Sequence, residues 1–340
     1  MPGPLKLASL WKIVRDVDLS APRDAARTPF AIVLVSETGA DAVRLRAVLS
    51  GSDVPHPWIE ASPATPDSLA ATSSAPVAGV LVTRQAALSE SMVAAQQRFA
   101  TAGAPVLVVV VGDRSPGSGL ARAGERARVV LSAIDESAIE PMALALADLA
   151  GDDRQLALAS RLPLLRPAIV AHLIERTARA NASFAFTTGL AETVPLLSAP
   201  LNLGDIVVLT KNQVMMCYRI ALASGRDGEP RELIGEILGV LGGGMLFRQA
   251  ARQLVGLIPF IGILPKVAVA YAGTYAIGRA TSAWLTDGRR ITSETIAKYS
   301  RESLDRGIAV AERLSGAAAP VRQSRLERLR QFLPVPRRRA

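Results

Sequence analysis

The residues after the first long apolar run have the order of a phosphate-binding loop but lack its chemistry. In the stretch AIVLVSETGADAVRLRAVLSG, an apolar run leads into a turn around Gly39 and then into a segment compatible with a helix. A phosphate-binding loop, G-x-x-x-x-G-K-[ST], needs glycines that expose backbone amides, a lysine that neutralises charge and a hydroxyl that binds magnesium. With Ser36 aligned to the first glycine, Asp41 takes the place of the second, and its carboxylate would repel phosphate. Ala42 and Val43 then replace the lysine and the hydroxyl residue.

Two later apolar runs end in residues that match fragments of a guanine-nucleotide site. In VVVVGDRS, Asp113 occupies the position of the aspartate that reads the guanine edge in an N-K-x-D motif. Val110 and Val111 replace the asparagine and the lysine of that motif. The last run ends in LSAID, where Ser132 and Ala133 match the short S-A motif that supports the base in such sites.

The remaining parts of a phosphoryl-transfer site are missing. The run GVLVT is followed by RQAAL and not by a D-x-x-G motif. Without a magnesium ligand or a residue that positions water, phosphoryl transfer has almost no chemical basis. We therefore predict no catalytic residue, no metal and no cofactor, and we interpret four positions as remnants of a nucleotide site: Gly39, Asp113, Ser132 and Ala133. Two other interpretations stay open: an ordinary strand-to-helix corner, or a backbone at 36–41 that holds GTP with Arg44 in place of the lysine.

Other catalytic and metal-binding patterns are not found in the sequence. There is no G-x-S-x-G elbow. Cys217 is the only cysteine and the two histidines are His56 and His172, so a zinc site of cysteine and histidine is not expected. Cys217 and His172 fall in helix-compatible segments and are interpreted as packing residues. His56 falls in a proline-rich stretch and is interpreted as solvated.

Four short apolar runs predict the strands of a parallel sheet. They are rich in β-branched residues and apolar at nearly every position, which is typical of strands covered by helices on both faces. The runs are 30–36, 79–83, 105–111 and 128–132. Helices are expected between and after them at 40–50, 86–102 and 136–150. The alternation predicts an α/β domain over 29–150.

Two stretches of this domain are predicted to be loops that offer exposed contacts. Residues 51–77 are rich in proline, serine and alanine. Residues 112–125 follow the third predicted strand, at the edge where open α/β sheets bind ligands.

The sequence after the α/β domain predicts an all-α, hydrophobic domain over 151–310. Helical apolar spacing covers 154–162 and 167–184. A further helix of about five turns is expected, with Asp205 as its N-cap and Gly225 as its C-cap.

Two glycine-rich segments of the helical domain bear on membrane contact. Residues 233–247 carry glycines at four-residue spacing, which lets another helix, or a second copy of the chain, approach closely. Residues 254–278 are long enough to span a bilayer. However, Pro259, Pro265 and Lys266 fall near their middle, where a charge costs at least ~2.5 kcal/mol. We interpret the segments as a hairpin that inserts partly or lies at the membrane surface; the alternative is a helical pair buried in a soluble protein or a dimer.

The charge of the chain fits an anionic partner. The formal net charge is +9, and the predicted basic tail, 311–340, ends in RQSRLERLRQFLPVPRRRA, with seven arginines and one glutamate. Anionic lipid would attract this tail. The low aromatic content, 4%, argues against stacking on single-stranded nucleic acid. Residues 1–28 predict an amphipathic N-terminal helix through Leu10, Val14 and Val17 and lack the apolar core of a signal peptide, so the chain is expected to stay on the cytoplasmic side.

The C-terminal half resembles a known bacterial family. The likeness covers roughly 155–300 and is carried by LTKNQVMMCYRIALASG, ELIGEILGVLGGG, RQLVGLIPFIGILPK and VAYAGTYAIGRA. These segments resemble bacterial proteins in which an Era/Ras-like GTPase domain, often degenerate, precedes the hydrophobic domain of unknown function 697. The resemblance implies a membrane-associated helical domain after a P-loop-fold GTPase-like domain. Of the family's nucleotide-binding positions, only Asp113, Ser132 and Ala133 are matched.

These observations predict a non-catalytic, membrane-associated scaffold or partner-binding protein built on a pseudo-GTPase domain. Expected partners are membrane lipid, another protein or both, and the glycine-rich helices would support a homo-oligomer. The expected location is the cytoplasmic side of the cell membrane, with the cytoplasm as the alternative. Two other functions stay open: an NTP-binding or GTP-hydrolysing protein with an atypical loop, and a nucleic-acid-binding protein that uses the basic tail.

Overall fold

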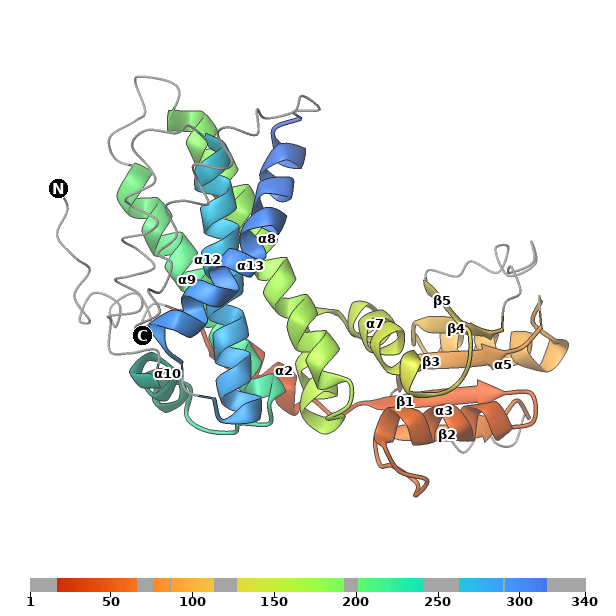
Figure 1. Cartoon of the computed structure of the whole chain (residues 1–340). Helices are drawn as coiled ribbons and strands as arrows, with labels where there is room; N and C mark the ends of the chain where they lie inside the picture. Colours follow the sequence, from red (N-terminus) through yellow and green to blue (C-terminus); the bar gives the residue numbers. More distant parts are fainter. Residues whose placement is uncertain are drawn as a thin grey trace, which may run out of the picture. The chain divides into compact units, whose positions relative to one another are not determined.

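The chain forms two compact units in the structure, which is a computed structural model (Figure 1). The α/β unit comprises Ser20–Val170 with Leu222–Arg226, and the helical unit comprises the described parts of Ala171–Ala221 and Asp227–Ala340. The described residues are 17–65, 76–85, 87–112, 127–192, 201–240, 263–289 and 291–316. The division after Val170 lies beyond the boundary predicted at residue 150, because helix α7 (Ile139–Arg161) continues past that point within the α/β unit.

A five-stranded, fully parallel sheet forms the centre of the α/β unit. Its strands lie in the order β2-β1-β3-β4-β5. They are β1 (Ala31–Ser36), β2 (Ile59–Pro63), β3 (Pro76–Thr83), β4 (Val106–Val111) and β5 (Ala127–Leu131). Every residue of β1 is buried, as expected for a strand with neighbours on both sides and helices on both faces. The predicted parallel α/β architecture is confirmed.

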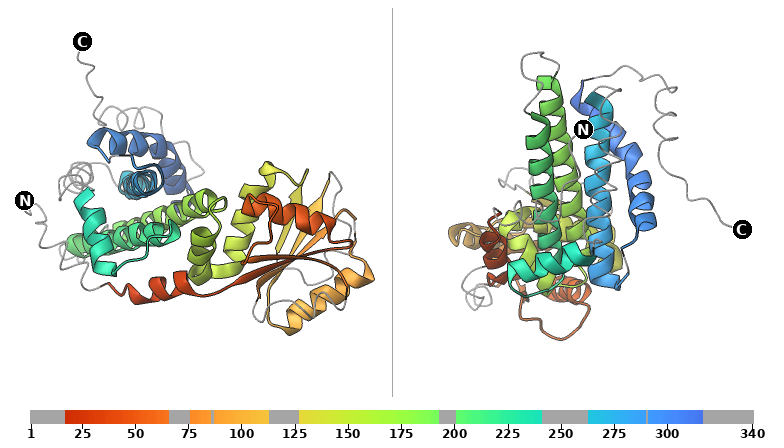
Figure 2. Two further views of the ribbon diagram at one scale, coloured as in Figure 1. Left: turned by 90° about the horizontal axis from the view of Figure 1, so that it is seen from below. Right: turned by 90° about the vertical axis from the view of Figure 1, so that its left-hand side faces the viewer.

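Helices cover both faces of this sheet (Figure 2). Helix α5 (Glu90–Thr101) lies on one face, and α3 (Ala40–Ser50) and α7 lie on the other. Helix α2 (Ser20–Arg27) packs against α7, and the short 3-10 helix η1 (Glu136–Ala138) precedes α7. Gly151 interrupts α7 with a positive φ of 70°.

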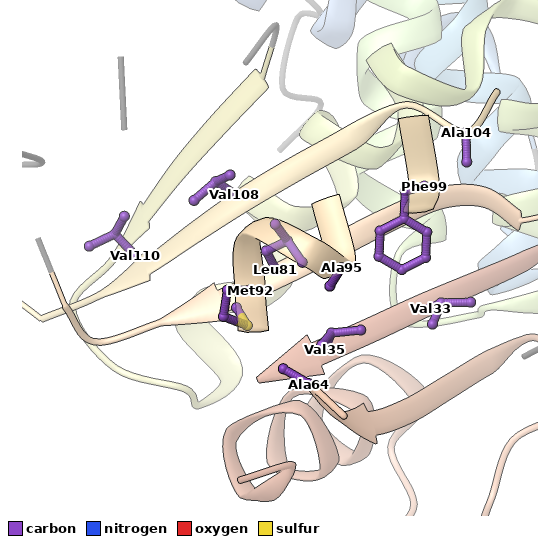
Figure 3. Packing of buried hydrophobic residues seen from close by; sticks show 10 residues of the cluster. All are labelled: Val33, Val35, Ala64, Leu81, Met92, Ala95, Phe99, Ala104, Val108 and Val110. Atoms are coloured by element: carbon purple, nitrogen blue, oxygen red, sulfur yellow. The ribbon is translucent and has the colours of Figure 1, made fainter. Parts of the chain in front are cut away.

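Alternate residues of β1, β3 and β4 pack against α5 (Figure 3). The cluster consists of Val33, Val35, Ala64, Leu81, Met92, Ala95, Phe99, Ala104, Val108 and Val110. Gly79 of β3 makes room for the ring of Phe99, because a Cβ at Gly79 would lie 2.3 Å from the ring atom Cδ2. The glycine therefore allows α5 to lie this close to the sheet.

The helical unit contains long helices that lie side by side (Figures 1 and 2). Its described helices are α8 (Arg166–Glu192, which begins in the α/β unit), α9 (Leu201–Ala223), α10 (Pro230–Val240), α12 (Ile263–Asp287) and α13 (Ser293–Leu314). Helices α12 and α13 form an antiparallel hairpin. Their backbones approach closely at Gly307, where a Cβ would lie 2.6 Å from the carbonyl oxygen of Ala268. Ser303 Oγ, one turn away, lies 3.4 Å from the carbonyl oxygen of Ala272.

Sequence analysis correctly predicted four of the five strands but missed β2. The loop predicted over 51–77 is wrong at 59–63, where β2 pairs with β1, and at 76–77, which begin β3. Strand β2 is an edge strand of sequence IEASP, so it has neither the continuous apolar run of a central strand nor a clear alternation. Residues 66–75 of that stretch, and 113–125 of the second predicted loop, lie outside the described residues.

One predicted helix start is corrected by the structure. Helix α9 begins at Leu201, so Asp205 lies inside the helix and is not its N-cap. The predicted helix end at Gly225 is confirmed, since Gly225 has a φ of +79° and its N–H donates to the carbonyl of Leu222 over 2.9 Å. The predicted amphipathic helix near the N-terminus falls mostly on residues 1–16, outside the described part of the chain; Val17 lies in a bend and α2 begins at Ser20.

The hydrophobic segments are only partly described. Pro265, near the middle of the segment 254–278, lies in the first turn of α12, where proline is tolerated. Residues 241–262, with Pro259, and the basic tail from 317 onward lie outside the described residues. Among the helices that are described, none combines the length and apolar character needed to cross a bilayer.

Candidate functional site

The carboxyl ends of β1 and β3 mark the place where a sheet of this topology holds a ligand. The strand order reverses between these neighbours, since β2 lies on one side of β1 while β3, β4 and β5 follow on the other. Open α/β sheets bind ligands outside the carboxyl ends of the strands at such a switch point. The residues there come from the turn after β1, the first turn of α3, the end of β3 and the start of α5.

The N-terminus of α3 is capped by hydroxyls of the turn that precedes it. Gly39 is the N-cap residue, with a φ of 81° and no side chain to act as a cap. The N–H of Ala42 donates to Ser36 Oγ over 3.1 Å, and that of Ala40 donates to Thr38 Oγ1 over 3.4 Å. Such amides are the donors that a helix N-terminus offers to an anion. Here the chain's own oxygens occupy them.

Asp41 and Arg84 form an ion pair at the switch point. Arg84 Nε donates to Asp41 Oδ2 over 2.7 Å and Arg84 Nη2 donates to Oδ1 over 2.8 Å, which is the bidentate arrangement. The hydrogen bond from Arg84 holds the pKa of Asp41 below its ordinary value, and partial burial of the carboxyl opposes this effect. The guanidinium that follows β3 is therefore directed at a carboxylate of the same chain.

Glu37 connects the turn after β1 to the start of α5. Ser91 Oγ donates to Glu37 Oε2 over 3.1 Å and lies 2.9 Å from Ser89 Oγ. Ser89 is the N-cap of α5 and accepts the N–H of Met92 over 3.3 Å. A second carboxylate thus stands at the switch point, and the N-terminus of α5 is capped as well.

The predicted site residues fall at two separate places on this edge of the sheet. Gly39 lies at the switch point, in the turn after β1. Ser132 and Ala133 follow β5, which is separated from β1 by two strands, so about 14 Å of sheet lies between the two places at the usual strand spacing. Asp113 lies outside the described residues.

The electrostatics of this edge disfavour a phosphate ligand. Arg44, considered above as a substitute for the lysine, is exposed on α3, and its charge helps to lower the pKa values of Asp41 and Asp135. The described residues include no group of three or more histidine, cysteine, aspartate or glutamate side chains that could hold a metal ion. Two carboxylates stand where phosphate would need positive charge, and Arg84 and two amides at the start of α3 are paired within the chain.

The other residues with reactive side chains occupy structural positions. Cys217 is buried, its Sγ lies 3.4 Å from Thr281 Oγ1, and burial raises the pKa of the thiol to about 11, which suppresses the reactive thiolate. His56 is partly buried, contrary to the solvated state expected for it. Its Nδ1 accepts the N–H of Trp58 over 3.3 Å, and burial lowers its pKa. His172 is partly buried on α8.

The structure brings together a group of polar residues that sequence analysis did not predict. Asn181 of α8, Asn212 and Gln213 of α9, and Thr274 of α12 are joined by side-chain hydrogen bonds, and we call these four residues the polar layer. The signal was present in the sequence as polar residues within hydrophobic helices. Their partners lie up to 93 positions apart, so that the connection between them could not be inferred without the fold.

The fold and the edge residues define a class of protein. The α/β unit is a doubly wound parallel sheet with the strand order of flavodoxin-type domains, and at its switch point lie one internal ion pair and the capped start of α3. No family model, curated protein or solved structure matches the chain. Because a fold of this kind supports many activities, the function is inferred from the edge residues themselves.

Proposed function

We propose that the chain is a non-catalytic scaffold or partner-binding protein, in which a pseudo-GTPase α/β unit is joined to a helical unit that associates with a membrane surface. The observation that supports this most is the pairing at the switch point. Arg84 binds Asp41 through two hydrogen bonds, and Ser36 accepts an amide of the first turn of α3. The groups that would grip a phosphate are engaged inside the chain.

A nucleoside triphosphate would have to displace these contacts without a compensating gain. It would bring several negative charges next to Asp41 and Glu37, and like charges at such distances repel. Asp41 also lies in the first turn of α3, where a carboxylate is favoured by the helix dipole. The α/β unit has a parallel sheet and carries the Ser132–Ala133 dipeptide after its last strand. Both features support the idea that this unit descends from a nucleotide-binding domain, in line with the family resemblance.

The nucleotide part of the proposal predicts that the full chain does not bind Mg²⁺–GTP. Calorimetric titration is expected to show no binding with a Kd below about 1 mM. The double variant Glu37→Gln/Asp41→Asn keeps the size of both side chains but removes both charges and releases Arg84. We expect it to bind phosphate or GTP weakly and in a salt-sensitive manner.

The matched control adds Arg84→Ala to the double variant, which should abolish the gained binding if Arg84 is the anion receptor. Arg44→Ala in the same background should have little effect, since Arg44 lies outside the ion pair. Micromolar binding of GTP with turnover by the unmodified chain would overturn the proposal and favour the NTPase alternative.

The membrane part of the proposal rests on the basic tail and on the hydrophobic segment before α12. Each arginine near an anionic surface contributes about 1 kcal/mol at low salt. In vesicle flotation, the full chain is expected to rise with vesicles that contain phosphatidylglycerol. It should rise less with pure phosphatidylcholine, and a chain ending at Gly316, which keeps every described helix, should lose most of the difference. If neither chain floats with either vesicle, membrane association is excluded.

A further inference from the structure

The polar layer crosses the core where α8, α9 and α12 meet. Asn181 Nδ2 donates to Thr274 Oγ1 over 2.9 Å, and Gln213 Nε2 donates to the same oxygen over 3.1 Å. The Thr274 hydroxyl donates in turn to the carbonyl of Ala270 over 2.8 Å. Asn212 Nδ2 completes the group by donating to Asn181 Oδ1 over 2.7 Å. The threonine hydroxyl thus uses its one proton and both lone pairs, with no bonding capacity left over.

Burial makes the hydrogen bonds of this layer costly to lose. The exposed fraction is 0% for both Asn181 and Thr274 and 8% for Gln213. An amide donor left without an acceptor at such a position carries the full cost of its desolvation. A packing arrangement of the helices that keeps these hydrogen bonds is therefore much more stable than one that breaks them.

The repeated alanine and tyrosine contacts beside the polar layer distinguish much less. On α8, Ala178 and Ala182 face the core at four-residue spacing, and on α12 the buried Tyr271 and the partly buried Tyr275 have the same spacing. If α12 slid by one turn, a tyrosine would again face an alanine. Gly278 is the competing apolar contact, since a Cβ there would lie 2.7 Å from Cγ1 of Ile174. Cores of small or repeated residues lose uniqueness of packing before they lose stability.

A slide of one turn would, by contrast, destroy the polar layer. It would bring Ala270 or Gly278 to the position of Thr274, and neither residue has a hydroxyl. The buried amides of Asn181 and Gln213 would then lose their acceptor. We propose that the polar layer fixes the axial register of α12 between α8 and α9, so that the helical unit holds one packing arrangement where the repeated alanine and tyrosine contacts allow more than one. This inference is independent of the proposed function.

Cys217 provides a reporter of the register. Its Sγ lies 3.4 Å from Thr281 Oγ1, so the variant Thr281→Cys should form a disulfide in the observed register. Because burial suppresses the thiolate in the folded protein, each variant is refolded from denaturant in an oxidising thiol–disulfide buffer. The variants Ile277→Cys and Leu285→Cys place the second thiol one turn away in either direction, and should cross-link poorly. The fraction of each variant that carries a disulfide can be measured by mass spectrometry.

The test compares these three reporters with and without the polar layer. The variant Asn181→Leu/Gln213→Leu/Thr274→Val replaces the buried members by apolar residues of similar size, a change that helical cores often tolerate. We expect cross-linking at 277 or 285 to rise by up to about tenfold, the change that one buried hydrogen bond supports. Cross-linking at 281 alone, as in the unmodified chain, would overturn the proposal and show that the close packing at Gly278 fixes the register.

Two further variants keep the test decisive if the triple variant fails to fold. Thr274→Val alone removes the shared acceptor and should broaden the cross-linking pattern, while Thr274→Ser keeps the hydroxyl and should restore the single disulfide at 281. The same pattern in both variants contradicts the proposal, because a role of the threonine in packing alone would not separate them in this way.

Discussion

Replacing Gly307 with valine is expected to destabilise the helical unit by about 3 kcal/mol or more. The reason is that the new Cβ would lie 2.6 Å from the carbonyl oxygen of Ala268 and 3.2 Å from its Cα. Both atoms belong to the backbone of α12, so no side chain can turn away to relieve the contact. Helices α12 and α13 would have to separate, and the contact of Ser303 Oγ with the carbonyl oxygen of Ala272 would be lost with the close approach.

Urea unfolding followed by circular dichroism measures this effect. The matched control is Ala309→Val, which introduces the same β-branched side chain two residues later on α13, at a partly exposed position. It should cost about 0.5 kcal/mol, the difference in helix propensity. An equal loss of stability in the two variants would show that helix propensity, and not the backbone contact, is responsible.

Replacing Gly79 with valine is expected to destabilise the α/β unit by about 3 kcal/mol. A Cβ at this position would lie 2.3 Å from Cδ2 and 2.4 Å from Cγ of Phe99. Cγ is the first ring atom, so rotation of the ring cannot clear it, and α5 would be pushed away from β3. The melting temperature of the α/β unit should fall, and its near-ultraviolet circular dichroism should weaken.

The partner residue offers a direct control for this second prediction. Phe99→Ala alone leaves a cavity in the cluster and should cost about 3–5 kcal/mol. In the double variant Gly79→Val/Phe99→Ala, the valine occupies part of the space that the ring has left. The loss should therefore be smaller than the sum of the two single losses by about 2 kcal/mol. Strict additivity would indicate that the ring is not the group that excludes a side chain at Gly79.

The parts of the fold that could be predicted are those in which local sequence and burial agree. Strands β1 and β4 are continuously apolar because they are covered on both faces, and their sequence alone indicates this. Strand β2 was missed because its sequence, IEASP, lacks the apolar run that identified the other edge strand, β5, and its pairing with β1 is a tertiary contact. The predicted start of α9 was wrong because it was based on the preference of aspartate for N-cap positions, whereas the helix begins four residues before Asp205.

Sequence analysis identified one member of the candidate site. It placed Asp41 where a phosphate-binding loop needs a glycine, and from this it predicts that nucleotide binding is disfavoured, which the titration with GTP tests. It could not show that Arg84, 43 positions later, pairs with this carboxylate, because a contact across the sheet depends on strand order. The tie between Glu37 and Ser91, 54 positions apart, was hidden for the same reason.

The long sequence separation within the polar layer has a consequence for folding during synthesis on the ribosome. Asn181 is translated 93 residues before Thr274, which at roughly 5–20 residues per second corresponds to about 5–20 seconds of elongation. Throughout that interval the hydroxyl that unites the layer has not been made. The α/β unit, whose sheet is complete at residue 131, can fold during this time. Helices α8 and α9, in contrast, lack α12 as a packing partner, so their apolar faces are available for binding by chaperones of nascent chains.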